Sequence, residues 1–319
     1  MRFALMSEPQ QGLSYEEILA LVRTAEDAGF EAYFRSDHYA SFPGAAGLPT
    51  TDAWATLAGL ARETTRIQLG TLVSPVTFRL PGNFAKMVTT VAEMSGGRIE
   101  CGVGAGWNEV EHKQLGLPYP GNRERFDMLE EELAILHGLW TEPDGWSYQG
   151  HHWQVEDALF YPKPPAPAGR RHPNILIGGD GGPRMARLVA QYADEFNLTS
   201  GSPQRVEPAY ARVRAACHKY GRNDREVTYS MMTGVLIGKD QSDVNRRVRE
   251  LLVALGQGDD VDPEAWFAER SKRWIMGTPD QARQRVAEYE ALGVERIMLQ
   301  DFLPRDLEMV RLMGEVFLT

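Results

Sequence analysis

The sequence predicts an α/β fold, a (β/α)8 TIM barrel with insertions after the fourth strand and after the seventh. Short apolar runs alternate with longer amphipathic segments along the whole chain, which is the pattern of alternating strands and helices. The apolar runs are nearly continuous, as in parallel strands that are covered on both faces. Eight such units suit a closed barrel better than an open sheet. We therefore expect residues 1–319 to form a single barrel domain.

The elements follow one another in the order that this fold requires. Amphipathic stretches predict a helix after most of the strands, among them Tyr15–Ala28, Ala53–Thr64, Asn83–Met94, Arg123–Trp140, Arg184–Ala193 and Pro203–Tyr220. The predicted strands are Arg2–Met6, Ala32–Arg35, Ile67–Val73, Arg98–Gly104, Asn174–Gly179, Glu195–Thr199, Thr228–Ile237 and Arg296–Gln300.

Glycines indicate which end of the barrel is structural. Gly29, Gly96 and Gly293 each stand between the end of a helix and the next strand, where glycine closes the helix in the left-handed conformation. These junctions mark the end at which the strands begin. Chemistry is therefore expected at the opposite end, where the strands of such a barrel deliver their functional side chains.

Two stretches interrupt the alternation. The first, about 143–173, contains an expected hairpin of Trp146–Tyr148 with Trp153–Val155, followed by a proline-rich run that cannot be helical. The second, 256–276, predicts an acidic loop and a short helix. Loops of this length are often lids or binding walls, so we expect both insertions to shape a pocket.

Composition and charge exclude several classes of protein. The net charge of −10 argues against nucleic-acid binding. No apolar run approaches the length of a membrane span and no signal-peptide pattern is present, so a cytoplasmic protein without a membrane partner is expected. Cys101 and Cys217 are the only cysteines, which excludes a disulfide framework and a cysteine metal site. The spacing of His, Asp and Glu predicts no other metal site.

The second predicted strand ends in Ser36-Asp37-His38. Charged residues at the strand ends of a barrel usually take part in chemistry. Serine and aspartate are also common helix caps, and His38 could be an ordinary loop residue. This stretch alone supports both interpretations equally.

The fourth strand ends in Gly102-Val103-Gly104-Ala105-Gly106, followed by Trp107, Asn108 and Glu109. Glycines at alternate positions could let a flat, ring-shaped ligand approach the backbone, or they could only permit a tight turn. The spacing differs from the dinucleotide-binding fingerprint, and no clear helix follows it.

The fifth strand leads into Gly178-Gly179-Asp180-Gly181-Gly182-Pro183 and then a helix. Glycines offer free backbone N–H groups, proline suits the first helical position, and a helix N-terminus attracts anions. This is the strongest local signal for a phosphate site. Arg184 and Arg187 could add positive charge, whereas Asp180 would have to turn outward.

Taken together, these motifs resemble the luciferase-like flavin and deazaflavin barrel superfamily, and particularly its branch that depends on coenzyme F420. The resemblance spans essentially the full chain and implies hydride transfer to or from the deazaflavin. It is carried by Ser36-Asp37-His38, Leu69-Gly70-Thr71-Leu72-Val73, Thr77-Phe78-Arg79, Gly102–Gly106, Gly178–Pro183 and Gly277-Thr278-Pro279.

The resemblance also assigns residues to roles. It implies that His38 is the acid–base or polarising group beside the reacting carbon, and that a non-prolyl cis peptide bond at Leu72–Val73 supports the ring. Glu109 is a second candidate catalytic residue, shifted in register because Trp107 stands where sugar-phosphate dehydrogenases of this branch carry a glutamate. The expected cofactor-binding residues are Asp37, Thr71, Leu72, Val73, Ser74, Gly104, Gly106, Asn108, Gly178, Gly179, Gly181 and Gly182.

The substrate and the cofactor remain open at this level. Trp107 in place of the glutamate disfavours a glucose-6-phosphate-type dehydrogenation. Trp107, Phe42, Trp54 and Tyr39 could form an apolar wall for a small hydrophobic substrate, or could simply be core. The first hypothesis is an F420-dependent oxidoreductase. The alternatives are an FMN-dependent monooxygenase that uses oxygen and a non-catalytic cofactor-binding barrel. We also expect a homodimer.

Overall fold

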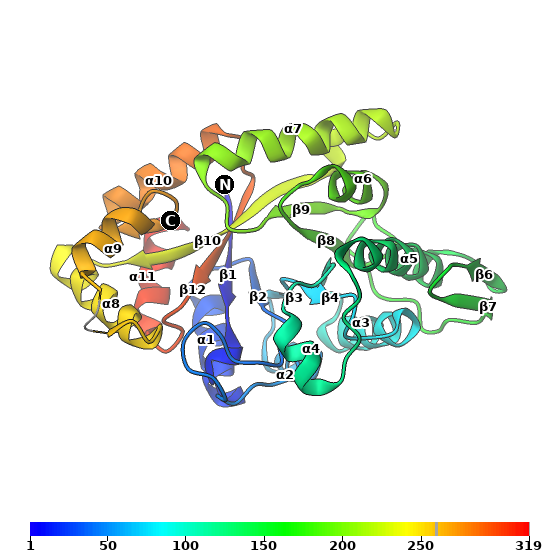
Figure 1. The fold of residues 1–319 in the computed structure, drawn as a ribbon, viewed down its shortest axis with the longest axis horizontal. Helices are drawn as coiled ribbons and strands as arrows, with labels where there is room; N and C mark the ends of the chain where they lie inside the picture. Colours follow the sequence, from blue (N-terminus) through cyan, green and yellow to red (C-terminus); the bar gives the residue numbers. More distant parts are fainter. Residues whose placement is uncertain (259–260, 319) are drawn as a thin grey trace.

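The computed structural model describes residues 1–258 and 261–318. Within them, eight parallel strands close into a barrel in the order β10-β12-β1-β2-β3-β5-β8-β9, and β9 pairs back with β10 (Figure 1). The predicted α/β barrel is therefore confirmed. Its strands are β1 (Arg2–Ser7), β2 (Ala32–Arg35), β3 (Gln68–Thr71), β5 (Ile99–Gly104), β8 (Asn174–Gly179), β9 (Glu195–Leu198), β10 (Thr228–Ile237) and β12 (Arg296–Asp301).

Helices surround this barrel. None in the described part of the chain is both long and apolar enough to cross a membrane. They are α1 (Tyr15–Asp27), α2 (Ala53–Glu63), α3 (Pro81–Ser95), α4 (Glu109–Leu115), α5 (Asn122–Thr141), α6 (Pro183–Tyr192), α7 (Pro203–Lys219), α8 (Gln241–Ala254), α9 (Pro263–Arg270), α10 (Pro279–Ala291) and α11 (Leu307–Phe317), with single 3₁₀ turns at Pro9–Gln11 and Asp224–Glu226.

The third strand differs from its prediction. It is broken into β3 and a short β4 (Ser74–Pro75) that pairs with β5, and the cis peptide bond between Leu72 and Val73 lies at the break. The predicted position of that bond is confirmed. A further short strand, β11 (Ile275–Gly277), extends the sheet beside β10.

The interior of the barrel is layered because successive side chains along a strand point to opposite faces. The middle layer is apolar and includes Ala4, Phe34, Leu176 and Met298. The layer nearest the strand tips receives one residue from each strand, or from the position just after it. These residues form the floor of a cavity: Met6, Ser36, Leu72, Gly104, Gly178, Thr199, Met232 and Gln300.

The layer at the opposite end is a closed cluster of charges around Arg296, whose guanidinium forms ion pairs with Glu31, Glu100 and Glu195 at 2.5, 2.7 and 2.9 Å. Asn174 Nδ2 donates a further hydrogen bond to Glu100. Burial opposes ionisation of Glu100, but Arg296 outweighs it and lowers the pKa of that carboxyl. Burial dominates at Glu195 and raises its pKa.

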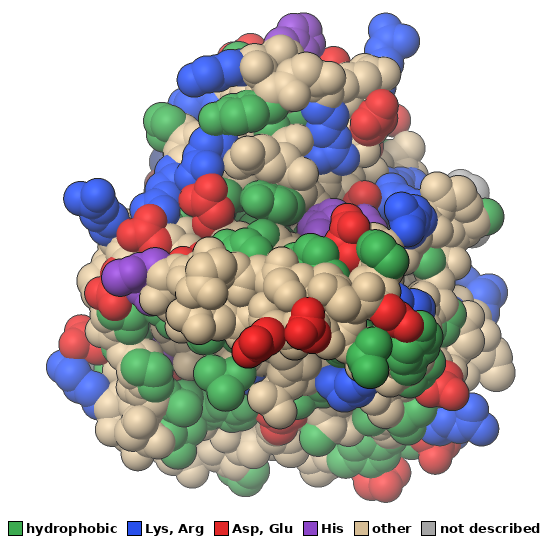
Figure 2. Space-filling view, turned by 90° about the vertical axis from the view of Figure 1, so that its right-hand side faces the viewer, with side chains coloured by type: hydrophobic (Ala, Val, Ile, Leu, Met, Phe, Trp, Pro, Cys, Tyr) green, Lys and Arg blue, Asp and Glu red, His purple; other side chains and the backbone are tan. Residues whose placement is uncertain are grey.

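The first insertion forms the predicted hairpin, β6 (Trp146–Gln149) with β7 (Gln154–Ala158). It follows the end of the long α5, which carries the chain away from the strand tips, and it projects at the right of Figure 1. Glu131 of α5 holds its turn by accepting backbone N–H groups of His151, His152 and Trp153. Figure 2 views the molecule from this end and shows acidic, basic and apolar side chains interspersed over the surface.

The expectation that both insertions shape the pocket is met only by the second segment and only indirectly, since no described residue of 143–173 or 256–276 lines the cavity. In the second segment, where residues 259 and 260 lie outside the described part of the chain, the predicted short helix is α9. Trp274 stacks on Phe302, with ring centroids 5.3 Å apart, and Phe302 lines the cavity. This segment therefore supports the cavity wall from behind.

Candidate active site

A cavity of about 670 Å³ opens at the C-terminal ends of the barrel strands. This volume lies within the range of small-molecule and cofactor sites. The walls above the floor are mostly apolar, with Phe42, Trp107, Phe126, Met185 and Phe302. Its charged or titratable lining residues are Glu8, His38, Asp180 and Arg205.

His38 lies on the cavity wall and is held from behind by Glu111 of α4. Its Nδ1 is 2.8 Å from Glu111 Oε1, and the second carboxylate oxygen accepts the backbone N–H groups of Tyr39 and Ala40 at 2.8 and 3.3 Å. The Glu111 side chain is only 1% exposed. No hydrogen bond joins the other ring nitrogen, Nε2, to a described residue.

The helix that delivers Glu111 is absent from the sequence prediction, which saw no clear helix after the fourth strand. α4 has seven residues, too few for an amphipathic period to stand out. Asn108 starts it, since its side chain accepts the N–H of Val110 at 3.2 Å. His112 anchors it, with Nδ1 2.6 Å from the Asn108 carbonyl and Nε2 2.6 Å from Thr77 Oγ1.

Two of the four predicted aromatic wall residues face the cavity. Phe42 and Trp107 pack edge-on against His38 and against each other, with centroids 4.5–5.7 Å apart. Trp107 is 64% exposed, which is unusual for a tryptophan side chain. Trp54 is core instead, and Tyr39 stacks on Phe78 outside the cavity.

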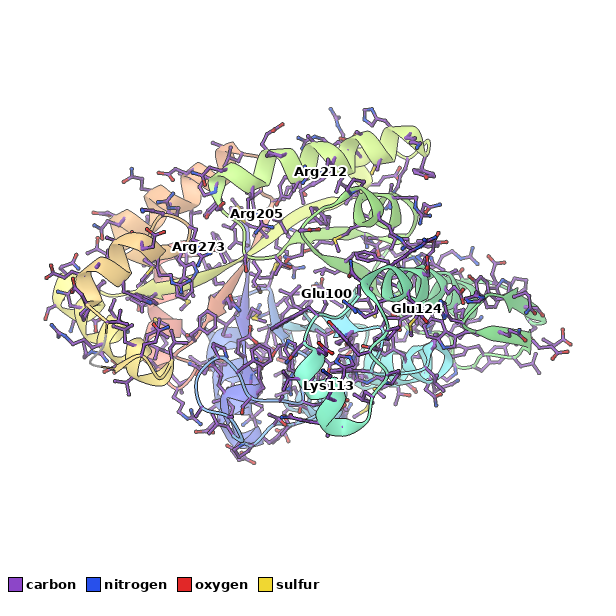
Figure 3. All side chains as sticks on the ribbon, in the orientation of Figure 1. Glu100, Lys113, Glu124, Arg205, Arg212 and Arg273 are labelled. Carbon is purple, nitrogen blue, oxygen red and sulfur yellow. The ribbon has the colours of Figure 1, made fainter. Side chains whose placement is uncertain are left out.

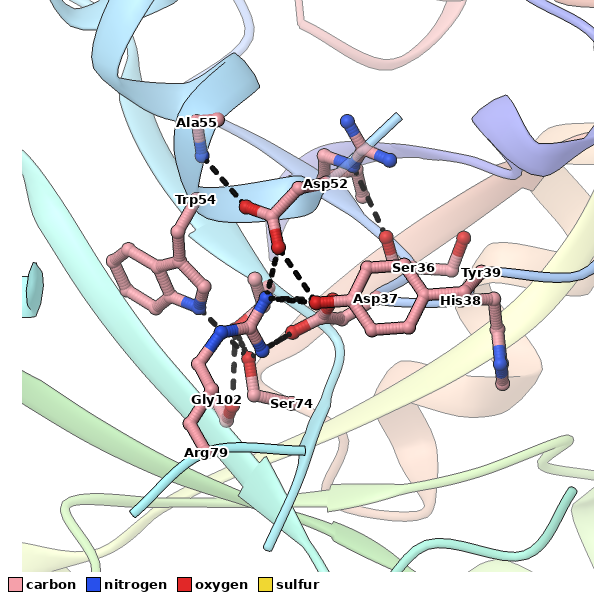
Figure 4. A network of polar contacts seen from close by, with 12 residues as sticks. Ser36, Asp37, His38, Tyr39, Asp52, Trp54, Ala55, Ser74, Arg79 and Gly102 are labelled. Atoms are coloured by element: carbon pink, nitrogen blue, oxygen red, sulfur yellow. Dashed lines mark hydrogen bonds and ion pairs between the residues drawn. The ribbon is translucent and has the colours of Figure 1, made fainter. Parts of the chain in front are cut away.

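A polar network fixes the loop that carries His38 (Figure 4). Arg79 bridges Asp37 and Asp52, with Nη1–Oδ2 and Nη2–Oδ2 distances of 2.5 and 2.6 Å. Ser74 Oγ donates to the same Asp37 oxygen at 2.7 Å, and Tyr39 OH donates to Asp52. Burial opposes the charge on Arg79, but the carboxylates prevail and raise its pKa. The Asp37 carboxylate thus binds Arg79 and Ser74 of the protein itself, and it does not line the cavity.

The glycines at the C-terminal ends of β5 and β8 leave room for another part of the chain. A Cβ on Gly102 would lie 1.9 Å from the Thr71 carbonyl oxygen. On Gly104 and Gly178 it would lie 2.7 and 2.9 Å from methyl groups of Val73. The close approach expected of a ligand is therefore made by the broken third strand, although Gly104 and Gly178 also line the cavity.

Three neighbouring helices begin beside the cavity without a side-chain cap. The N-cap residues of α5, α6 and α7 are Gly121, Gly182 and Ser202, and none provides a capping hydrogen bond. By contrast, aspartate side chains cap α2, α8 and α11. Uncapped helix N-termini leave N–H groups and a partial positive charge for an anion.

The arginine beside these helix N-termini is Arg205, and not Arg184 or Arg187 as the sequence suggested. Arg184 and Arg187 pair with Asp127 and Glu130 of α5. Arg205, at the start of α7 (Figure 3), lines the cavity and donates to the carbonyl of Ser200 at 3.1 Å. Asp180 is exposed, and its side chain accepts the N–H of Gly182 at 3.0 Å.

The structure divides the predicted site residues into two groups. Those that line the cavity are His38, Leu72, Val73, Gly104, Gly106, Gly178 and Gly179; those that do not are Asp37, Thr71, Ser74, Asn108, Glu109, Gly181 and Gly182. Glu109 is 54% exposed and pairs with Lys113 one turn along α4, so its position does not support a catalytic role.

Sequence reasoning missed Glu8, Glu111 and Arg205. Glu8 directly follows β1, and this position at a strand tip was a usable signal. Its carboxylate accepts hydrogen bonds from Gln10 Nε2 and Gln300 Nε2 at 2.7 and 2.5 Å.

Comparison with known proteins gives relatives along the whole chain. The F420-dependent glucose-6-phosphate dehydrogenase of Microbacterium testaceum (strain StLB037) is 29% identical, over 100% of this chain and 96% of that protein. The pyrimidine monooxygenase RutA of Stutzerimonas stutzeri (strain A1501) is 31% identical, over 83% of this chain and 72% of that protein.

Solved structures share the fold. An F420-dependent secondary alcohol dehydrogenase in complex with an F420-acetone adduct superposes with a TM-score of 0.81 at 18% identity, covering 99% of this chain and 98% of the other. The monooxygenase RslO1 from Streptomyces bottropensis gives 0.83 at 22% identity, covering 100% and 99%. The family model for luciferase-like monooxygenases matches residues 1–296. The chain therefore belongs to the luciferase-like monooxygenase family.

Proposed function

We propose that this protein is a coenzyme F420-dependent oxidoreductase that transfers a hydride between the deazaflavin and a small hydrophobic organic substrate. The observation that carries the proposal is the arrangement of one cavity. A histidine backed by a carboxylate lies on one wall, and uncapped helix N-termini with Arg205 begin beside the same cavity. Relatives described as F420-dependent dehydrogenases support the choice of cofactor.

The residues present fit a deazaflavin. The N-termini of α5, α6 and α7 with Arg205 would hold its phosphate-bearing tail, because they offer N–H donors and the cavity's arginine. Leu72 and Val73, which both line the cavity, would back the ring. When bound, the deazaflavin supplies the hydride chemistry, and the protein provides binding and orientation.

The residues of the chain then have separable roles. His38 gives or takes the proton at the heteroatom of the substrate, as a histidine can do near neutral pH. Phe42 and Trp107 shield the reacting groups from water and favour an apolar substrate. Arg205 is the single arginine or lysine among the described lining residues, and we assign it to the cofactor rather than to a phosphorylated substrate.

A second candidate is an FMN-dependent monooxygenase that uses molecular oxygen. It is favoured by the 31% identity to the pyrimidine monooxygenase RutA of Stutzerimonas stutzeri. FMN has a tricyclic ring and a phosphate as well, so the same cavity would serve it.

A fluorescence-quenching titration with coenzyme F420 and with FMN separates these candidates. We expect tight binding of F420 and weak binding of FMN. Arg205→Gln should weaken F420 binding roughly 10-fold by removing a charge-assisted contact, and should leave the affinity for a deazaflavin without the phosphate unchanged. Preference for FMN, with oxygen consumption by the reduced flavin, would support the monooxygenase instead, and binding of neither would contradict both.

A further inference from the structure

We infer that Glu111 is the positioning residue for His38: it keeps a proton on Nδ1 and thereby dedicates Nε2 to proton exchange with the substrate. The inference deepens the proposed function and rests on it for the identity of the reaction. It concerns a residue that the motifs of the sequence did not single out.

The geometry of the carboxylate carries the inference. Oε1 lies 2.8 Å from His38 Nδ1, while Oε2 is occupied by two backbone N–H groups of the loop that follows His38. A carboxylate can only accept hydrogen bonds, so His38 must donate from Nδ1. Because Tyr39 and Ala40 hold the second oxygen, the carboxylate cannot rotate away from the ring.

The electrostatics agree with this role. Glu111 is almost fully buried, and among the described residues its only ion-pair partner is His38. The carboxylate therefore accepts the Nδ1–H of the ring whether or not Nε2 also carries a proton. Phe42 and Trp107 pack against the ring and restrict its orientation.

The resulting step balances in the direction of substrate reduction. As the hydride reaches the carbon of a C=O or C=N group, the π electrons move to the heteroatom. The Nε2–H bond of His38 breaks, and its proton forms a bond to that heteroatom. The imidazole is left neutral, and its Nδ1–H still donates a hydrogen bond to Glu111. Solvent then returns the lost proton to Nε2.

The test uses two variants of the same helix in the full-length protein. Glu111→Gln keeps the shape of the side chain but carries one oxygen and one NH₂ group. Tyr39 and Ala40 require the oxygen, so the NH₂ turns to Nδ1 and forces the proton of the neutral ring onto Nε2. Glu109→Gln, two residues earlier and exposed, is the matched control.

We expect Glu111→Gln to lower kcat about 100-fold or more, with the Kd for F420 within twofold of the parent. Glu109→Gln should change neither quantity. Glu111→Asp, which retains a carboxylate, should recover at least tenfold of the loss. In the cofactor-free protein, ¹⁵N NMR of the imidazole should show the Nδ1–H tautomer for the parent and the Nε2–H tautomer for Glu111→Gln.

An unchanged tautomer in Glu111→Gln, or a kcat within threefold of the Glu109→Gln value, would overturn the inference. The NMR measurement needs no cofactor, so it distinguishes failure of this inference from failure of the proposed function. If the parent bound neither F420 nor FMN but showed the expected tautomers, the positioning role would stand and the proposed reaction would fall.

Discussion

The two ends of this barrel both bury charged side chains, yet they use them differently. At the closed end, Arg296 is surrounded by three carboxylates from neighbouring elements, and none of these four described residues lines the cavity. At the open end, His38 has one partner behind it and a free ring nitrogen in front. The comparison teaches that a buried ion pair alone does not indicate function. A buried pair is a stronger candidate for a function when one of its groups also lines a cavity, as His38 does.

Removing the charge of Arg296 at the closed end should have the largest effect on the stability of the fold. Arg296→Met should reduce the free energy of unfolding by about 3–5 kcal/mol, because it leaves buried carboxylates without their cation. Urea denaturation measures this value. Each folded molecule should keep its kcat, since Arg296 does not line the cavity.

Arg2→Met is the control for the closed end, because Arg2 is half exposed and lies 3.9 Å from Glu31. Its effect should stay below about 1 kcal/mol. Equal losses of stability in Arg296→Met and Arg2→Met would show that the burial of the Arg296 cluster does not matter for stability.

Removing His38 at the open end should have the opposite effect, a large loss of activity and a small loss of stability. His38→Asn should lower kcat about 100-fold or more while the Kd for F420 changes little. The loss of stability should be smaller than in Arg296→Met, because Glu111 retains its two backbone donors. Steady-state kinetics and thermal melting on the same preparations check both parts. If His38→Asn lowered the melting temperature but left kcat unchanged, His38 would have a structural role and no catalytic one.

A buried acid that belongs to neither cluster sharpens the comparison. Glu132 of α5 lies in the interior, and its Oε2 has no hydrogen-bond partner among the described residues. Burial raises its pKa to about 8 from the ordinary 4.5. The folded protein thus keeps a proton there that the unfolded chain gives up, and stability should decrease as pH rises between about 5 and 8.

The size of this effect is at most about 1.4 kcal/mol per pH unit. Glu132→Gln should remove that dependence, so its free energy of unfolding should approach or exceed that of the parent as the pH rises. Urea denaturation at pH 5.5, 6.5 and 7.5 gives the difference between the two proteins. A difference that stays constant over this range would show that Glu132 is ionised in the fold. Burial also raises the pKa of Asp301, to about 7. Asp301 is present in both proteins, so its contribution cancels in the difference between their free energies of unfolding.

The family resemblance implied the cis peptide bond at Leu72–Val73. The sequence by itself determined the barrel, the strand tip that carries His38 and the glycine turn before α6. These features depend on local properties, namely apolar runs, helix-closing glycines and short motifs at strand ends. Only the tertiary structure decided what those motifs contact. His38 and Glu111 are 73 positions apart, and the atoms that Gly102 and Gly178 accommodate come from the third strand.

The same reason explains the errors. Glu109 and Glu111 are indistinguishable by residue type and spacing, but the rotation of a seven-residue helix buries one and exposes the other. The first insertion follows a twenty-residue helix that carries it to the far end of the barrel, away from the cavity that its length suggested. Which side chains converge depends on packing between distant segments, and no local pattern of residues encodes it.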